Sequence, residues 1–373
     1  MQHKLSPYYG ITNKCIVQNG YNRSAIYNLE TGQHWFIDNK WETVFNELPL
    51  IDTKKLLKSR PDLTENELVE FLFSFVNEGV IRIIDEPLKS NYERIELNSD
   101  HSLKLKHLSI TFRSELEMGI YAFLKLNPTE HLILSIGAIN NETFPFLNTL
   151  TEDLVEKITL IIEPLIIEED FLFELISQNP MIRAIYIDEQ SPIKNQKIGF
   201  CEFKLKDRIT RAGQPEIYIN FDQFNGSSQY HTYFHKRVHI MANGDITHSH
   251  DSNRVFGNIN DENFNEIIRS NSFQSIWKVK KNEIDVCNHC EFAPVCQDKR
   301  PLIRRSDGTW YSEIECEYNP YISKEKKDEN YLSLEECGIS STPRGFRIGI
   351  SAYLAAKAHI IGKEKRALRP YKG

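Results

Sequence analysis

The sequence lacks most of the features that identify common enzyme and membrane classes. Its longest apolar run, residues 158–167, is interrupted by Glu163 and Pro164 and is too short for a bilayer, which needs about 20 apolar residues. No strand-like segment is followed by a glycine-rich phosphate loop, and no G-x-S-x-G or H-E-x-x-H motif is present. These absences argue against a membrane-spanning chain, a P-loop nucleotide-binding protein, a serine hydrolase and a zinc protease.

Acidic residues outnumber basic ones. The 373 residues include 45 Lys and Arg against 52 Asp and Glu, which gives a formal net charge of −7. Such a balance favours solubility and speaks against nucleic-acid binding by the chain as a whole. The first 20 residues also lack the basic start, apolar run and cleavage site of an export signal, so we expect a cytoplasmic protein.

Cysteine is scarce and unevenly distributed. Of seven cysteines, four fall within a single short segment, as Cys287, Cys290, Cys296 and Cys316. In a reducing compartment such clustering indicates metal or iron–sulfur ligation rather than disulfides. A C-x2-C pair binds from a single tight turn, and four thiolates complete either a tetrahedral zinc site or a [4Fe-4S] cluster. The spacing leaves both alternatives open.

The first ninety residues have the pattern of a small winged-helix-like module. A longer helix begins at Thr64, which forms a capping box with Glu67, and ends near Gly79. The remaining elements, short strands and helices, are predicted at residues 24–29, 34–37, 40–46, 53–59 and 80–84.

A module of this kind could bind either DNA or a peptide. Its longest helix carries Glu65, Glu67 and Glu70, whereas a helix that reads DNA is basic. We therefore favour a peptide-recognition module, to which an extended peptide adds as a further strand beside a helix. Because such binding uses backbone hydrogen bonds, the sequence does not identify the peptide-binding residues.

Apolar runs of strand length alternate with helical spacing in the middle of the chain. The helical segments are predicted at residues 115–126 and 169–177. The strands are predicted at residues 108–112, 132–136, 158–162 and 182–187, with a last one at 217–221. This alternation predicts an α/β fold of parallel βα units, either covered on both faces or rolled into a partial (β/α) barrel.

The cysteine-rich region resembles a SPASM domain, the auxiliary iron–sulfur module of many radical-SAM enzymes that modify peptides. Three segments carry the resemblance, together with the C-x2-C-x5-C run that starts at Cys287. They are Asn243-Gly244-Asp245-Ile246, Phe256-Gly257-Asn258-Ile259 and Cys316-Glu317-Tyr318-Asn319-Pro320-Tyr321.

Two further segments resemble one branch of this family, the SPASM-domain peptide maturase of grasp-with-spasm (graspetide-type) systems. These are Cys15 to Ser24 and residues 284–292. In such systems an ATP-grasp ligase crosslinks a short precursor peptide. The resemblance spans roughly residues 8–321. It implies a leader-peptide recognition element at 1–90, a degenerate partial barrel at 100–225 and a SPASM domain at 226–321, with a charged linker and basic amphipathic tail at 322–373.

The chain departs from the family at several positions. Full SPASM domains carry two clusters, but Ser249 and Lys299 stand where the resemblance expects cysteines of the first. The resemblance assigns Cys287, Cys290, Cys296 and Cys316 to the second cluster, as one [4Fe-4S] cluster or, alternatively, one structural zinc. Radical-SAM chemistry needs a C-x3-C-x2-C loop, and the isolated Cys15 and Cys201 cannot supply it.

The resulting prediction is an accessory, non-catalytic maturation protein. We expect it to bind a ribosomally synthesised precursor peptide and to present it to a partner ATP-grasp ligase, without radical-SAM activity. One alternative is a metal-dependent enzyme that modifies peptides and uses an open coordination position. A less favoured alternative is a winged-helix transcriptional regulator.

A group of histidines is the other candidate metal site. His231, His235 and His239 recur every four residues and would share one face of a helix or of a strand. Because no carboxylate spacing around them matches a catalytic zinc site, we favour surface or hydrogen-bonded histidines.

The end of the chain is basic. Residues 344–372 contain eight Lys or Arg and a single acid, Glu364, with a loose apolar stripe at helical spacing. Such a tail could dock on an acidic partner or a membrane surface. A solvated, partly ordered extension is the favoured interpretation.

Overall fold

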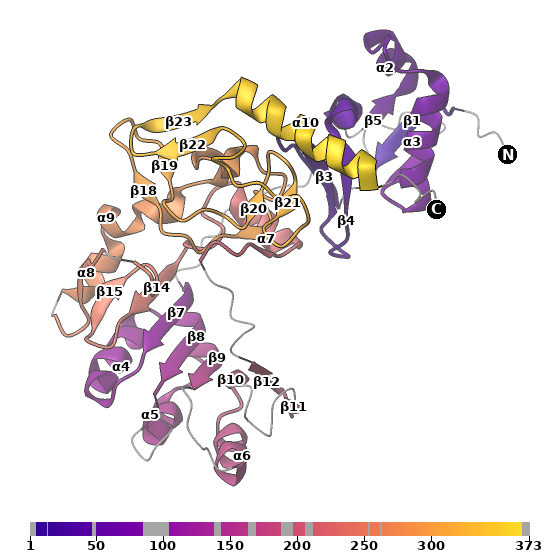
Figure 1. The fold of residues 1–373 in the computed structure, drawn as a ribbon. Helices are drawn as coiled ribbons and strands as arrows, with labels where there is room; N and C mark the ends of the chain where they lie inside the picture. Colours follow the sequence, from indigo (N-terminus) through magenta and orange to yellow (C-terminus); the bar gives the residue numbers. More distant parts are fainter. Residues whose placement is uncertain are drawn as a thin grey trace, which may run out of the picture.

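The computed structural model describes residues 5–12, 14–46, 50–84, 104–137, 143–162, 169–187, 197–205, 212–252, 254–261 and 263–367. Figure 1 shows the large sheet at one end, the cysteine-rich region in the middle and the N-terminal helices at the other end. No helix in the described ranges combines the length and the hydropathy that a bilayer crossing requires.

The N-terminal helices accompany a three-stranded antiparallel sheet. Strand β1 (Tyr8–Ile11) lies between β5 (Leu50–Asp52) and β6 (Ile81–Ile84). The helical elements are η1 (Asn39–Trp41), α1 (Glu42–Asn46), α2 (Thr53–Ser59) and α3 (Glu65–Asn77). The predicted capping box is present, since Thr64 and Glu67 each accept a hydrogen bond from the other's backbone N–H. Gly79 follows α3 with φ of +72°, the conformation that ends a helix and that glycine adopts without strain.

The strands predicted at residues 24–29 and 34–37 form a sheet of their own. Strands β2 (Cys15–Gln18), β3 (Arg23–Asn28) and β4 (His34–Asp38) pair antiparallel in that order. Alternate residues of β3 point to different neighbours: Ile26 packs into the core of the N-terminal helices, while Tyr27 packs against Val295 of the cysteine-rich region. The β2-β3-β4 sheet therefore connects the N-terminal helices to the cysteine-rich region. The alternation of residues along β3 does not show which neighbours its two faces contact.

A large mixed sheet occupies the middle of the chain and confirms the predicted parallel arrangement. Its order is β11-β12-β10-β9-β8-β7-β14-β15-β16. The six strands from β12 to β14 in that order are parallel. The bounds are β7 (Leu105–Thr111), β8 (Thr129–Ile136), β9 (Val155–Ile162), β10 (Ile182–Ile187), β11 (Lys197–Ile198), β12 (Cys201–Leu205), β14 (Arg237–Ile240), β15 (Asp245–Thr247) and β16 (Gly257–Asn258).

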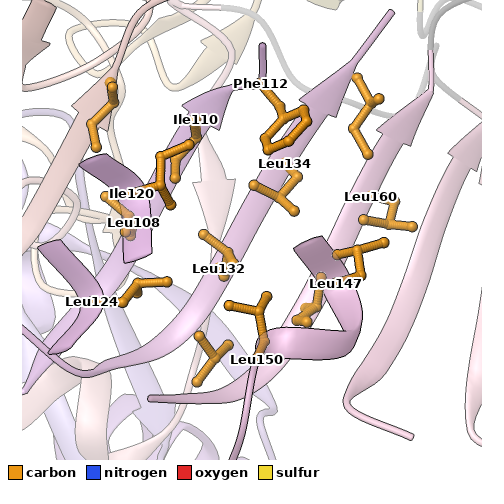
Figure 2. Close-up of a cluster of buried hydrophobic side chains, with 14 of the residues drawn as sticks. Leu108, Ile110, Phe112, Ile120, Leu124, Leu132, Leu134, Leu147, Leu150 and Leu160 are labelled. Carbon is orange, nitrogen blue, oxygen red and sulfur yellow. The ribbon is translucent and has the colours of Figure 1, made fainter. Parts of the chain in front are cut away.

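Helices pack on one face of this sheet. They are α4 (Glu117–Leu126, preceded by η3, Ser114–Leu116), α5 (Thr143–Thr149) and α6 (Glu169–Gln178). Figure 2 shows Ile120 and Leu124 of α4 and Leu147 of α5 against Leu132 and Leu134 of β8. The arrangement is compatible with a partial barrel. The strand expected at residues 217–221 is shorter than predicted, because Asn220 accepts a hydrogen bond from the Gln223 N–H (2.8 Å) and caps a helix there.

The cysteine-rich region consists of short elements joined by turns. They are β13 (Glu216–Ile217), α7 (Phe221–Ser227), α8 (Phe264–Arg269), α9 (Asn271–Gln274), η5 (Ser275–Lys278), η6 (Lys281–Glu283), η7 (Cys287–His289), β17 (Cys296–Gln297), β18 (Ile303–Arg304), β19 (Trp310–Tyr311), β20 (Tyr318–Asn319) and β21 (Lys324–Glu325). A hairpin of β22 (Ile339–Thr342) and β23 (Gly345–Ile348) then leads into α10 (Ile350–Ala367).

Helix α10 packs on the protein through one side. Tyr353, Ala356 and Ile360 are buried in a cluster with Val286 and Tyr321 of the cysteine-rich region. Figure 1 shows α10 running from the hairpin back toward the N-terminal sheets. The described part of the tail is therefore anchored by apolar contacts, in contrast to the solvated extension favoured above.

Candidate iron–sulfur site

The four clustered cysteines reach a single cavity from separate segments. Cys287 and Cys290 bracket the turn η7, where the Cys290 N–H donates to the Cys287 carbonyl (3.1 Å). Cys296 lies on β17, and Cys316 follows β19. All four line one cavity.

The donor atoms of this cavity bear on what it can hold. A single zinc ion binds each thiolate at about 2.3 Å and would draw the four sulfurs around one point. Within the described ranges, no three His, Cys, Asp or Glu side chains are arranged to hold a single metal ion. Four thiols around one cavity match the donor set of a [4Fe-4S] cluster, and the same four thiols could complete a tetrahedral zinc site.

The backbone that enters the C-x2-C turn is strained. Val286 is buried and has φ of +67°, a conformation that β-branched residues rarely adopt. The surrounding structure holds it in place: Ile284 forms a β-bridge with Trp310, and the Asp285 N–H donates to the Trp310 carbonyl (2.9 Å). The position of Cys287 is therefore fixed by contacts far away in the sequence.

Burial raises the pKa of every thiol in the cavity. For Cys287, Cys290 and Cys296 desolvation is the largest cause, and for Cys316 it raises the pKa to about 11. Free thiolates are therefore disfavoured at neutral pH. A bound metal centre would replace these protons, because thiolates are its ligands and its binding releases them.

The antiparallel β2-β3-β4 sheet packs beside this site through contacts with Glu291. Arg23 Nε donates to the buried Glu291 carboxylate (2.7 Å), and the Tyr27 hydroxyl donates to the Glu291 carbonyl (2.7 Å). A Cβ on Gly20 would lie 2.8 Å from the Glu291 nitrogen, so only glycine allows this approach. The Tyr318 hydroxyl also donates to Glu291. Burial, followed by the Cys290 and Glu291 charges, raises the pKa of Tyr27, and burial and Glu291 raise that of Tyr318.

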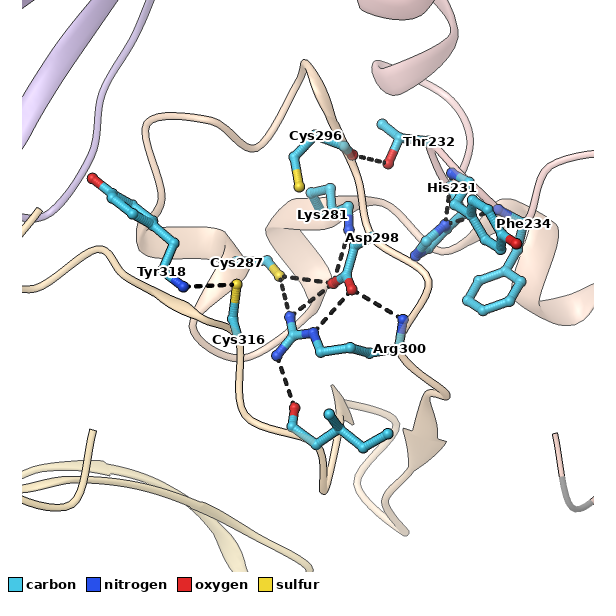
Figure 3. Close-up of polar contacts among 12 residues, drawn as sticks. His231, Thr232, Phe234, Lys281, Cys287, Cys296, Asp298, Arg300, Cys316 and Tyr318 are labelled. Carbon is cyan, nitrogen blue, oxygen red and sulfur yellow. Dashed lines mark hydrogen bonds and ion pairs between the residues drawn. The ribbon is translucent and has the colours of Figure 1, made fainter. Parts of the chain in front are cut away.

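Three buried charged side chains lie on another side, as Figure 3 shows. Asp298 binds Arg300 through both carboxylate oxygens (2.9 and 2.7 Å), and its Oδ2 lies 3.1 Å from Lys281 Nζ. Burial by itself raises the pKa of Asp298, but the two cations together hold it well below its usual range. Burial likewise lowers the pKa of Lys281, yet Asp298 and the nearby cysteines raise it to about 12. All three groups are charged at neutral pH.

The positions that depart from the family lie in different surroundings. Lys299 pairs with Glu216 (2.6 Å), and its neighbour Arg300 lies at the cavity in its place. Ser249 lines another cavity together with His248 and Arg254, and its buried hydroxyl has no hydrogen-bond partner in the described structure. Four site residues could not be recognised from the sequence, because charged residues normally lie at exposed positions. They are Lys281, Glu291, Asp298 and Arg300.

The three remaining cysteines and the histidine group lie elsewhere. Cys15, Cys201 and Cys337 are buried in three different apolar clusters. The expectation that the three histidines share one face is wrong: His231 and His235 lie in a turn and His239 in β14. Each has a local role. His231 Nδ1 accepts from the Phe234 N–H (3.0 Å), His235 stacks on Tyr230 (3.7 Å between ring centroids), and His239 Nδ1 is hydrogen-bonded to the Ser109 hydroxyl (2.8 Å).

Comparison with known proteins supports the iron–sulfur interpretation of this region. Residues 233–291 match the family described as SPASM: iron-sulfur cluster-binding domain. This segment runs from just before β14 to just after Cys290, so it includes the first two cysteines of the site, while Cys296 and Cys316 follow it.

Comparisons over the whole chain are less informative than the match to this segment. No curated protein matches the chain. Among solved structures, the crystal structure of Streptococcus suis SuiB bound to S-adenosylmethionine aligns over 78% of this chain and 94% of its own, with 8% identity and a TM-score of 0.27. A similarity this loose carries no argument about activity.

Proposed function

We propose that this protein is an accessory partner in the maturation of a ribosomally synthesised peptide. It binds the precursor peptide and presents it to an ATP-grasp ligase of the grasp-with-spasm type, without radical-SAM activity of its own. The main support is the distribution of thiols. Four converge on one cavity in a segment that includes a SPASM match, while the other three are dispersed among separate cores.

In this proposal Cys287, Cys290, Cys296 and Cys316 hold one [4Fe-4S] cluster with a structural role. Since all four positions would be filled by protein thiolates, no iron is left open for substrate. The cluster supplies the covalent links between η7, β17 and the loop that carries Cys316. The protein around it excludes water and fixes the C-x2-C turn. The ion pair between Arg23 and Glu291 attaches the β2-β3-β4 sheet to the site.

The peptide site that we propose is the outer edge of β6, a strand that pairs only with β1 among the described residues, in a winged-helix-like N-terminal module. β6 is an edge strand of the β5-β1-β6 sheet and directly follows α3. Its Ile83 side chain is 44% exposed. An extended peptide can pair with such an edge through its backbone and cover an apolar side chain at the same time.

Binding of a synthetic precursor peptide to the full chain tests this proposal. The peptide is the one encoded beside the gene, and affinity is measured by fluorescence anisotropy. We expect Ile83→Asp to weaken binding at least tenfold, because it places a charge where the peptide would bury an apolar side chain. Met118→Asp is the matched control, since Met118 is 80% exposed on α4 of the large sheet, and its binding should equal that of the wild type.

The alternative, a metal-dependent enzyme, makes a different prediction for the same preparation. Crosslinking of the precursor would proceed with the pure protein and no ligase. Under our proposal crosslinks form only when the ATP-grasp ligase and ATP are added, and addition of this protein accelerates that reaction.

A further inference from the structure

The Cys287 sulfur is contacted by a guanidinium that the protein holds in one orientation. Arg300 Nη2 donates to Cys287 Sγ (3.3 Å). The other nitrogens of the group are used, since Nε donates to Asp298 Oδ1 (2.9 Å) and Nη1 to the Ile314 carbonyl (3.1 Å). Figure 3 shows the guanidinium in contact with both Asp298 and the Cys287 sulfur, and these two groups also contact each other (Sγ to Oδ2, 3.7 Å). Its direction is therefore set by the protein whether or not the cavity is filled.

The surroundings of this contact carry excess positive charge. Lys281, Asp298 and Arg300 are only 4%, 6% and 4% exposed, and all three line the cavity. Two cations share a single carboxylate, so the group has a net charge of about +1, which is costly to bury unless an anion compensates it. A four-iron cluster with four thiolates supplies such an anion, with about −2 when oxidised and about −3 after uptake of one electron.

The surroundings of Cys290 lack this excess. There the buried carboxylate is that of Glu291, beside Cys290, and it is paired with Arg23 at 2.7 Å. A one-to-one pair adds no net charge. The protein therefore presents its positive charge to the Cys287 side of the site.

We propose that Arg300, held by Asp298 and assisted by Lys281, is the positioning residue that sets the reduction potential of the cluster. The inference rests on the [4Fe-4S] occupancy proposed above. A hydrogen bond to a ligating sulfur and a nearby positive charge both stabilise the more negative, reduced form. Arg300 therefore raises the midpoint potential for one-electron reduction, with the electron supplied by an external donor such as dithionite.

An anaerobic redox titration of the full chain, followed by electron paramagnetic resonance of the reduced cluster, measures this effect. Arg300→Gln should make reduction at least tenfold less favourable, which is a fall of about 59 mV for one electron. Lys299→Gln is the matched control: it removes the same charge one residue away, from a side chain that pairs with Glu216. Its potential should stay near that of the wild type.

Two further variants keep the test decisive. Arg300→Lys retains the charge but not the fork that binds both Asp298 and the sulfur, so its potential should fall between those of the wild type and Arg300→Gln. Lys281→Gln removes a cation that does not donate to the sulfur, and a smaller fall is expected. If Arg300→Gln does not retain iron, these two variants decide the matter.

Potentials that are equal in the wild type and in every Arg300 and Lys281 variant would overturn the inference. So would a wild-type protein that holds zinc and takes up no electron. Neither result changes the binding of the precursor peptide, which the anisotropy measurement reports separately.

Discussion

The large parallel sheet and the cysteine-rich region are stabilised by different means. The core between the sheet and its helices consists mainly of apolar side chains from β7 to β10 and from α4 to α6, and it extends to Phe264, Phe273 and Trp277 of the cysteine-rich region. The interior of the cysteine-rich region contains buried charged residues as well, among them Lys281, Glu291, Asp298 and Arg300. Apolar burial stabilises the sheet without any bound group. The cysteine-rich region combines apolar clusters with ion pairs around a cavity, so it depends in addition on what fills that cavity.

Removal of the bound group should separate the two regions most strongly. Structural metal centres contribute on the order of 10 kcal/mol to the folding of the segments that bind them. We expect Cys316→Ser, or treatment with a chelator and oxidant, to abolish protection from hydrogen–deuterium exchange in residues 281–319. Peptides from β8 and β9 should remain protected. Equal loss of protection in both regions would show that they do not differ in this way.

A core substitution in the sheet should have the opposite pattern and a smaller effect. Phe123 is fully buried on α4, with its ring centroid 5.7 Å from that of Phe264. Phe123→Ala should lower the free energy of unfolding by about 3–5 kcal/mol, because it creates a cavity. Iron content of the folded protein should not change. Met118→Ala, on the exposed side of the same helix, serves as the control, and urea denaturation gives both values.

Acid should weaken the strand that joins the two regions. His239 lies on β14, is 4% exposed, and burial lowers its pKa to about 4. Below pH 6.5 the unfolded chain binds a proton at this position and the folded chain does not, so stability falls as the pH falls from 6.5 to about 4.

The expected loss from this histidine is at most about 3 kcal/mol. His239→Gln cannot take up the proton, so its stability should depend less steeply on pH over that range. Denaturation midpoints at pH 7 and pH 5 measure the difference. An identical pH dependence in the variant would rule out His239 as the cause.

The elements that the sequence predicted well are those whose signals are local. The βα alternation predicted β7 to β10, and the capping box of Thr64 and Glu67 predicted the start of α3. The spacing from Cys287 to Cys316 likewise selected the four thiols that line one cavity.

The elements that could not be predicted depend on distant partners. The pattern at residues 24–29 predicted a strand there, but not that Tyr27 contacts Glu291, 264 residues away. Asp298 and Arg300 look like surface residues in the sequence, and only folding brings Lys281 next to them. Because buried charges require specific partners, composition alone does not locate them.

The central claim is that the cysteine-rich region encloses one cluster and that the chain carries no second one. Analysis of iron, sulfide and zinc in protein purified without oxygen tests it most directly. We predict about four irons and four sulfides per chain, and no zinc. One zinc per chain without iron, or about eight irons, would contradict the claim.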